Sequence, residues 1–328
     1  MPQSNPTTGK RVLAVLGQTA TGKSALAIAL AGRYDGEIVN CDSTAVYRGF
    51  DIGTDKVPAE AQRGIPHHLV DIVEPTEEYT AAQYARDAAR VIAEVHARGR
   101  LPILAGGTGF YYRAVTRGLF PGPGRDAGVR ERLRAIAARR GLQFLHRMLG
   151  RVDAASATRI QPRDEVRIVR ALEVFFLTGR SLTAHFAETV SPLAGWDVAA
   201  VALTMPAEDL VPRLARRVEE QFARGLLDEI RGLLARGIPE DAHPFGGLVY
   251  RQALEHLHGV RDEAATRALI VRENRRYARR QLIWFRKEAN LVWFRGAGEL
   301  PGTFDQVTRA LDAQFSRSPR RDSGAAAR

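Results

Sequence analysis

Cysteine is the scarcest residue in this sequence, since Cys41 is the single one among 328 residues. One cysteine excludes a disulfide within the chain and a metal site built from several thiolates. Long apolar runs are also lacking, because none approaches the roughly 20 residues that a membrane-spanning helix needs. Residues 1–10 are polar and have no apolar stretch typical of a secretion signal. We therefore expect a cytoplasmic protein with no membrane segment.

Acidic residues are few relative to basic ones. The sequence has 48 Lys and Arg against 37 Asp and Glu, which gives a net charge of +11 and a pI near 10.3. This excess is unusual for an enzyme of free small molecules and favours a polyanionic partner. A basic surface without a specific partner is the alternative. The length allows two compact units, since domains usually hold roughly 100–200 residues.

A stretch near the N-terminus carries a phosphate-binding pattern. The uncharged apolar run Val12–Leu16 is typical of a buried parallel strand. The pattern G-x-x-x-x-G-K-[ST] follows it, and helix-forming residues 25–31 come next. Backbone N–H groups of such a loop bind an anion together with the helix N-terminus, so we expect a diphosphate. We expect Lys23 to meet a terminal phosphate and the Ser24 hydroxyl to bind Mg²⁺. The predicted diphosphate-binding residues are Gly17, Gln18, Thr19, Ala20, Thr21, Gly22, Lys23 and Ser24.

A glycine-rich turn without a ligand is the alternative for this stretch. Beyond it, strand and helix patterns alternate. Short apolar runs predict strands at 36–40, 67–71 and 101–105, and the alanine-rich segment 79–98 predicts a helix. This alternation predicts an α/β fold with a parallel sheet like that of phosphate-loop NTPases.

Two polar residues lie where strands of this sheet are expected to end. Asp42 follows the strand at 36–40, and Thr108 follows the strand at 101–105. Ligands of open α/β sheets bind outside the carboxyl ends of the strands, so both residues should face the phosphate loop. Asp42 is a candidate general base, or else it holds water on Mg²⁺. Thr108 either caps the following turn or donates a hydrogen bond to a substrate.

The middle of the chain carries only helical patterns. Helices are expected at 127–140 and 162–178, and strand character returns at 196–203. Long helices are expected at 207–236 and 263–287. We accordingly divide the chain into the first part of the core at 11–119, a helical insertion at 120–195, and core completion with basic C-terminal helices at 196–298, with 1–10 and 316–328 disordered.

Basic residues cluster on two of the predicted helices. Arg163, Arg167 and Arg170 recur at i, i+4 and i+7, so they share one face of a helix. The segment 267–287 has eight Lys or Arg and one acid, hence +7, with three aromatic residues interleaved. A solvated surface helix is the alternative, but a phosphate backbone relieves the self-repulsion of such a helix. The pattern favours a nucleic acid partner.

These motifs together resemble one family, the tRNA dimethylallyltransferases. The resemblance extends over about residues 11–295, and its His-His and Arg-Ala-Leu-Glu blocks are not shared with ordinary kinases. The matching segments are 17–24, 42–43, 46–49, 51–54, 64–69, 106–109, 167–173, 225–226 with Glu229, 277–281 and 284–286.

The resemblance implies a specific chemistry. The phosphate loop of this family holds dimethylallyl diphosphate and not ATP, and Mg²⁺ is the expected cofactor. Asp42 is implied as the base on the exocyclic amine of the adenosine 3′-adjacent to the anticodon, and Thr108 helps to place that amine. Arg217 is implied to contact the diphosphate. We expect a monomer that acts on the anticodon stem-loop of tRNA.

The resemblance also implies contacts to tRNA. In this family the helical insertion and the basic C-terminal helix clasp the anticodon stem-loop. Carried over residue by residue, the predicted tRNA-binding residues are Asp42, Ser43, Thr44, Ala45, Thr108, Arg130, Val166, Arg167, Ile168, Val169, Arg170, Tyr250, Arg251, Arg275, Arg279, Arg280, Gln281, Trp284 and Arg286.

Four positions depart from the family pattern. The family usually has proline where Gln18 stands, and methionine and glutamine where Thr44 and Ala45 stand. It usually has glycine where Val249 stands, so we expect a different backbone there. The missing glutamine removes one contact to the target base but leaves the chemistry intact.

Two other functions compete with this one. A small-molecule kinase that uses ATP explains residues 17–24, but it gives no role to the basic helix or to the insertion. A noncatalytic RNA-binding protein explains those two features, but it leaves the combination of Lys23, Ser24 and Asp42 without a purpose.

Overall fold

The structure is a computed structural model, and it describes residues 9–317. Within that range the chain forms two compact units. The first unit comprises 9–116 and 193–317, and the second comprises 117–192. The insertion predicted at 120–195 overlaps the second unit, with each boundary three residues later than in the structure.

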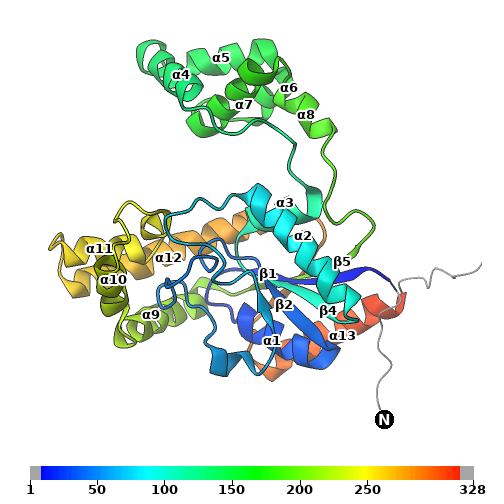
Figure 1. The fold of residues 1–328 in the computed structure, drawn as a ribbon. Helices are drawn as coiled ribbons and strands as arrows, with labels where there is room; N and C mark the ends of the chain where they lie inside the picture. Colours follow the sequence, from blue (N-terminus) through cyan, green and yellow to red (C-terminus); the bar gives the residue numbers. More distant parts are fainter. Residues whose placement is uncertain (1–8, 318–328) are drawn as a thin grey trace, which may run out of the picture. The chain divides into compact units, whose positions relative to one another are not determined.

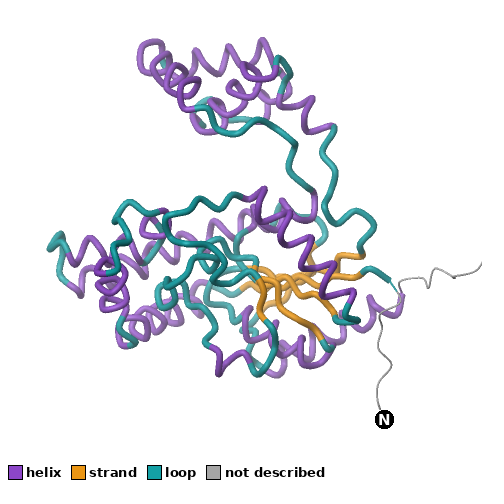
Figure 2. Tube along the Cα trace, in the orientation of Figure 1, coloured by secondary structure: helices purple, strands orange, loops and turns teal. Residues whose placement is uncertain are grey.

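The first unit is built on a parallel sheet, which confirms the predicted α/β fold. Among residues 9–317 the sheet has six strands in the order β3-β2-β4-β1-β5-β6. Figure 2 draws these strands in orange. Every pairing between neighbouring strands is parallel. The strands are β1 (Arg11–Gly17), β2 (Gly36–Asn40), β3 (His67–His68), β4 (Leu101–Ala105), β5 (Asp197–Thr204) and β6 (Leu291–Arg295).

Helices cover both faces of this sheet (Figure 1). One face packs against α1 (Lys23–Tyr34) and α13 (Pro301–Arg317). The other face packs against α2 (Ala81–Ala97) and α3 (Gly109–Arg117). Side chains along Val12–Leu16 alternate between the two cores. An uninterrupted apolar run therefore forms a strand that is buried on both sides.

A group of helices extends the first unit beyond the sheet. These helices share a third core with the loop after β2, and Phe50 of that loop stacks edge-on against Phe245 and Tyr250. The group consists of α9 (Ala207–Ala223), α10 (Leu226–Ala235), α11 (Tyr250–Leu257) and α12 (Glu263–Phe285), and two short 3₁₀ helices are Ala59–Gln62 and His243–Gly246.

The second unit is helical throughout the residues that the structure describes. One apolar core holds its helices together, with Leu133, Leu145 and Leu172 among the buried residues. The helices are α4 (Ala127–Arg140), α5 (Leu142–Val152), α6 (Ala154–Arg159), α7 (Glu165–Thr178) and α8 (Leu182–Ala187).

The structure corrects two predicted elements. The helix predicted at 207–236 is interrupted, because Gly225 has a φ of 90° and caps the start of α10. The strand predicted at 67–71 has only two residues, because the backbone of Leu69 and Asp71 turns into the left-handed region. Both interruptions matter for the site, since the two segments reach the loop after β2.

The ends of the described chain also differ from the prediction. The sequence patterns do not predict β6 or α13, and they place disorder from residue 316. Helix α13 includes residues 316 and 317, so the prediction is wrong for these two. Lys10 is placed too, since its carbonyl accepts a hydrogen bond from Asp197 N at 2.8 Å. Gly9 is described as well, and the remaining residues of the predicted disorder, 1–8 and 318–328, lie outside the described residues. No helix within 9–317 combines the length and the apolar character needed to cross a membrane.

Candidate active site

Two glycines adopt the backbone conformations that the phosphate loop needs. Gly17 ends β1 with a φ of 128°, and a Cβ there would lie 2.2 Å from the Leu203 carbonyl oxygen. Gly22 caps the N-terminus of α1 with a φ of 80°. Both conformations favour glycine, and the backbone of β5 leaves no space for a side chain at Gly17. The two fixed glycines of the pattern are therefore required by backbone geometry.

A cavity of about 350 Å³ opens beside this loop. The cavity is lined by the phosphate loop, the ends of β2 and β4, the segment that begins at Thr54, and the face of α9 that carries Arg213 and Arg217. Its lining includes Thr19, Ala20, Gly22, Lys23, Ser24, Asn40, Asp42, Ala45, Asp55, Gly106, Gly107, Arg213 and Arg217. Asp42 thus faces the phosphate loop, as its place at the end of a strand predicts.

Two cationic side chains reach the loop from different elements. Lys23 Nζ donates to the Gln18 carbonyl at 2.5 Å. Burial, and to a lesser extent the nearby Arg217, lowers the pKa of Lys23 to about 8. Arg217 on α9 donates through Nη1 to Thr19 Oγ1 at 2.9 Å. The cavity is therefore positively charged on two sides, as a site for a diphosphate requires.

Asp55 holds Arg217, and the sequence patterns do not identify this partner. The Asp55 carboxylate forms an ion pair with Arg217 and accepts a hydrogen bond from Gln221 Nε2 at 2.6 Å. Burial raises the pKa of the Asp55 carboxyl although Arg217 opposes the shift. Arg213, one turn before Arg217, donates to the Ala20 carbonyl at 2.8 Å. Arg213 lies four residues before Arg217, so helical spacing places the two side chains on the same face of α9.

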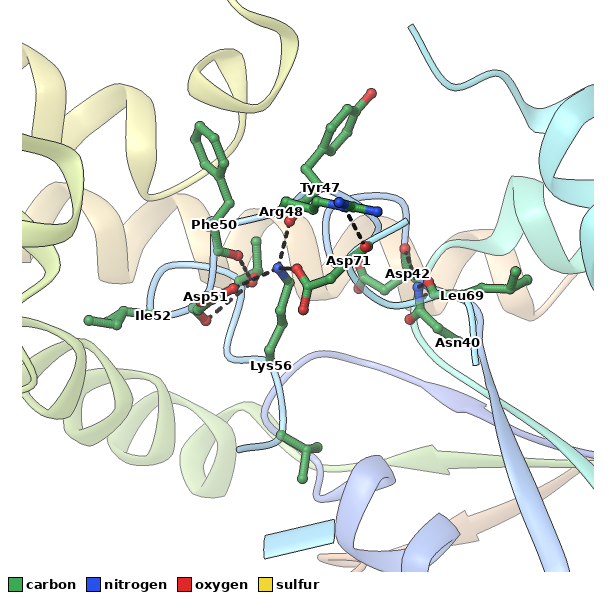
Figure 3. A network of polar contacts seen from close by, with 12 residues as sticks. Asn40, Asp42, Tyr47, Arg48, Phe50, Asp51, Ile52, Lys56, Leu69 and Asp71 are labelled. Carbon is green, nitrogen blue, oxygen red and sulfur yellow. Dashed lines mark hydrogen bonds and ion pairs between the residues drawn. The ribbon is translucent and has the colours of Figure 1, made fainter. Parts of the chain in front are cut away.

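The backbone of Asp42 is held by a buried amide. Asp42 N donates to Asn40 Oδ1 at 3.0 Å, and Asn40 Nδ2 donates back to the Asp42 carbonyl at 2.9 Å (Figure 3). Asn40 Nδ2 also donates to the carbonyl of Leu69 at 3.0 Å. Because Asn40 is buried at the end of β2, it fixes Asp42 relative to the sheet.

The side chain of Thr108 contacts the residue after Asp42. Ser43 N donates to Thr108 Oγ1 at 3.0 Å, and the Thr108 hydroxyl donates to Ser43 Oγ at 3.3 Å. Tyr277 of α12 interacts with Thr108 as well, and its pKa is raised by burial and by the charge of Asp42. The structure therefore brings Thr108 and Asp42 together and adds Tyr277 beside them, a contact that the sequence patterns do not predict.

A second network fixes the loop after β2 (Figure 3). Lys56 has a side chain only 6% exposed, and it donates to Asp51 Oδ1 at 2.7 Å and to the Tyr47 carbonyl at 2.5 Å. It also pairs with Asp71. A buried ammonium with two carboxylates and a carbonyl is an anchor for backbone segments, so Lys56 stabilises the loop that carries Asp55.

Tyr250 supports the same loop from the other side. Its hydroxyl donates to Glu229 Oε1 at 2.5 Å and accepts a hydrogen bond from Gly53 N at 3.0 Å. Glu229 Oε2 in turn accepts from Ile52 N at 2.8 Å. Tyr250 is buried, so its side chain is a support for the loop and does not reach RNA. Arg251, the next residue, is exposed.

Two other predicted residues turn out to hold the phosphate loop. Gln281 Oε1 accepts from Thr19 N at 2.7 Å, and its Nε2 donates to the Gly107 carbonyl at 2.9 Å. The buried side chain of Gln281 therefore links the loop to the turn after β4, and both of its polar atoms are bonded inside the fold. The side chain of Gln18 points away from the diphosphate cavity, toward Met205 N and the Ala278 carbonyl.

The exposed arginines of α12 lie on different faces. The guanidinium of Arg280 lies 5.6 Å from the ring centre of Tyr277. Arg275 and Arg279 line a separate cavity of about 380 Å³ between α9 and α12. Trp284 packs under Arg113, whose guanidinium lies 4.4 Å from its ring, and Arg286 is exposed.

The predicted tRNA-binding residues of the second unit divide into two groups. Ile168 and Val169 are buried in its core, so their side chains cannot contact RNA. Arg130 and Arg170 bind the buried carboxylate of Glu173. In contrast, Val166 is 78% exposed, and Arg167 is exposed beside Asp164. The helical spacing of the basic residues does not reveal that Arg130 forms an ion pair with the buried Glu173.

The chain is similar to known proteins over most of its length. The model of the family described as IPP transferase matches residues 45–288. A tRNA dimethylallyltransferase of Solibacter usitatus is 48% identical over 290 residues, which cover 88% of this chain and 94% of that protein. One of Geobacter metallireducens is 44% identical, with 90% and 95% covered.

Solved structures agree with this comparison. The full-length tRNA isopentenylpyrophosphate transferase of Bacillus halodurans superposes with a TM-score of 0.69 at 35% identity, covering 94% of this chain and 97% of that one. A eukaryotic dimethylallyltransferase acting on tRNA superposes with a TM-score of 0.76 at 25% identity, covering 96% and 81%.

Proposed function

The chain belongs to the IPP transferase family, and on this premise we propose that it is a tRNA dimethylallyltransferase. It transfers a dimethylallyl group from dimethylallyl diphosphate to the exocyclic amine of the adenosine 3′-adjacent to the anticodon, and it releases diphosphate. The observation that supports this most directly is the cavity in which Asp42 faces Lys23, Ser24 and Arg217. A base and a diphosphate site thus share one space.

The reaction needs a group that accepts a proton and groups that stabilise the leaving diphosphate. The lone pair of the amine forms the new N–C bond while the C–O bond breaks and its electrons leave with diphosphate. Asp42 accepts the proton that the amine loses. Lys23 and Arg217 stabilise the charge that develops on the departing oxygens. Thr108, bonded to Ser43 beside Asp42, is placed to orient the amine.

Mg²⁺ fits this site as a cofactor held mainly by the substrate. No cluster of three metal-ligating side chains occurs within residues 9–317. Mg²⁺ commonly takes one or two protein oxygens and completes its shell with phosphate oxygens and water. Ser24 Oγ at the start of α1 is the protein ligand that we propose. The bound ion would add positive charge at the leaving group.

The exposed basic residues are the proposed contacts to tRNA. We assign this role to Arg251, Arg275, Arg279, Arg280 and Arg286, which lie on the surface of the first unit. Exposed cations bind a phosphate backbone by releasing its counterions, and the target base must leave its stack to reach Asp42. In the second unit Arg167 and Val166 keep this assignment, since both are exposed.

An ATP-dependent kinase is not proposed, because the family and the relatives named above transfer a prenyl group. The deciding experiment supplies unmodified tRNA with labelled dimethylallyl diphosphate or with labelled ATP. Label in tRNA from the prenyl donor alone, found on adenosine after digestion to nucleosides, supports the proposal. Transfer of labelled phosphate to any acceptor, with no label from the prenyl donor, would overturn it.

A further inference from the structure

The carboxylate of Asp42 is held asymmetrically. Its Oδ1 accepts two hydrogen bonds from Thr44, one from the backbone N at 2.9 Å and one from Oγ1 at 2.7 Å. Within residues 9–317, Oδ2 has no hydrogen-bond donor. A carboxylate oxygen has two lone-pair positions, so Oδ1 is fully occupied and Oδ2 alone remains as an acceptor.

The backbone of Asp42 is held in place, so its carboxylate can move mainly by rotation about the side-chain torsions. Asn40 binds both the N–H and the carbonyl of Asp42, at 3.0 Å and 2.9 Å, and joins them to Leu69 (Figure 3). The bonds to Thr44 then remove the remaining freedom by fixing the direction of the carboxylate. Asn40 sets where Asp42 stands, and Thr44 sets which oxygen points outward.

The hydroxyl of Thr44 differs from its backbone donor in one respect. Any residue other than proline at position 44 supplies the N–H, but only serine or threonine supplies a hydroxyl at this distance from Asp42. The hydroxyl bond therefore depends on the side chain at position 44, and it uses the single donor of the Thr44 hydroxyl.

We propose that Thr44 is a positioning residue for Asp42, and this inference rests on the function proposed above. Its hydroxyl holds Oδ1, so that Oδ2 is directed at the amine whose proton it accepts. General-base catalysis depends on the geometry of the acceptor relative to the proton. A carboxylate that rotates freely spends part of its time with neither oxygen on that line.

The expected signature is a loss in turnover without a loss in binding. Thr44→Val keeps the shape but removes the donor, and kcat should fall by roughly 10-fold to 100-fold, the span of one hydrogen bond to a charged group. The KM values for tRNA and for dimethylallyl diphosphate should stay within about twofold of the unaltered protein. Thr44→Ser restores a hydroxyl and should recover most of the activity.

The experiment measures these constants for both Thr44 variants and for Thr308→Val. Thr308 is a buried threonine on α13 whose hydroxyl donates to the Phe304 carbonyl, so it controls for the loss of any threonine hydroxyl. The same change is then made in the Asp42→Asn background. If Thr44 acts through Asp42, Thr44→Val should reduce the residual activity of Asp42→Asn far less than it reduces that of the unaltered protein.

Three results would overturn the inference. They are a Thr44→Val protein with unchanged kcat, a Thr44→Ser protein as impaired as Thr44→Val, or an equal loss in both backgrounds. If Thr44→Val does not fold, which circular dichroism detects, the serine variant and its double mutant carry the test. Activity of the unaltered protein is recorded first: its absence contradicts the proposed function, whereas the outcomes above concern Thr44 alone.

Discussion

Arg130 and Glu173 form a two-point ion pair inside the helical second unit. Arg130 Nε lies 2.7 Å from Oε1 and Nη2 lies 2.8 Å from Oε2 of a carboxylate that is 0% exposed. Arg170 adds a third contact at 2.7 Å and also binds the Pro123 carbonyl at 2.8 Å. The pair therefore joins α4 and α7 to the segment before α4.

Replacing Glu173 should destabilise the second unit. Glu173→Gln leaves two guanidinium groups without a carboxylate, and losing one partner of a buried pair costs about 3–5 kcal/mol. We expect faster amide hydrogen exchange in α4 and α7 than in the sheet. Glu165→Gln is the matched control, because that side chain is half exposed and lies 3.7 Å from Arg134. Equal exchange in the two variants would contradict the role of Glu173.

The same carboxylate predicts a pH dependence. Burial alone would raise the pKa of Glu173, but hydrogen bonds from Arg130, Arg170 and Asp126 N outweigh it and lower the pKa to about 2. A lowered folded-state pKa stabilises the fold above the unfolded value of 4.5. This stabilisation of roughly 3 kcal/mol is lost as pH falls from 4.5 toward 2. Unfolding free energies measured across this window should show the loss, and Glu173→Gln should abolish that part of the slope.

Binding of dimethylallyl diphosphate should weaken at high pH. Burial and Arg217 lower the pKa of Lys23 to about 8, so the empty site loses this charge above pH 8, whereas a bound diphosphate stabilises the charged amine. Affinity should therefore fall by up to about tenfold per pH unit above 8. Calorimetric titrations between pH 7 and 9.5 test this. Lys23→Arg stays charged throughout, so its affinity should change less over the same range.

The exposed arginines of α12 should carry part of the salt dependence of tRNA binding. Replacing Arg275, Arg279 and Arg280 with glutamine should lower the slope of log K against log salt by about 0.7–0.9 per lost phosphate contact. Affinity for dimethylallyl diphosphate should be unchanged. Arg309→Gln on α13 is a control, since that arginine is exposed outside α12. An unaltered slope in the triple variant would show that α12 is only a solvated surface.

The backbone conformation of Val249 predicts which of two substitutions at this position gives the more stable protein. It has a φ of 79° and a ψ of −60°, so the valine occupies a backbone region that favours glycine. Val249→Ala and Val249→Gly both lose the buried side chain, but only glycine releases the strain. The glycine variant should therefore be the more stable of the two by about 1 kcal/mol, as measured by urea denaturation. A more stable alanine variant would refute the strain.

Local sequence patterns were sufficient for the parts of the site that lie within one strand–turn–helix segment. The phosphate loop and the strand-end position of Asp42 follow from residues adjacent in the chain, and the structure places both on one cavity. The supports of that cavity could not be predicted this way. Gln281 holds Thr19 across 262 positions, and Arg217 pairs with Asp55, which lies in a loop without periodicity.

Burial limits which of the predicted RNA contacts side chains can make. Ile168, Val169, Tyr250 and Gln281 lie in segments that match the family, but the structure buries their side chains. A motif match transfers a position in the sequence and not the direction of a side chain. The break at Gly225 is a different kind of error, because a glycine at that point was a visible signal for the end of a helix.

Replacement of Asp42 shows whether this carboxylate removes the proton from the target amine. Asp42→Ala is compared with the unaltered protein in single-turnover transfer of labelled dimethylallyl groups to tRNA, with tRNA affinity measured in parallel. We expect unchanged tRNA affinity and a transfer rate lower by roughly 10²–10⁴-fold, the contribution of a positioned base. A variant that transfers the label at an undiminished rate, or one whose loss in rate equals its loss in tRNA affinity, would contradict the account.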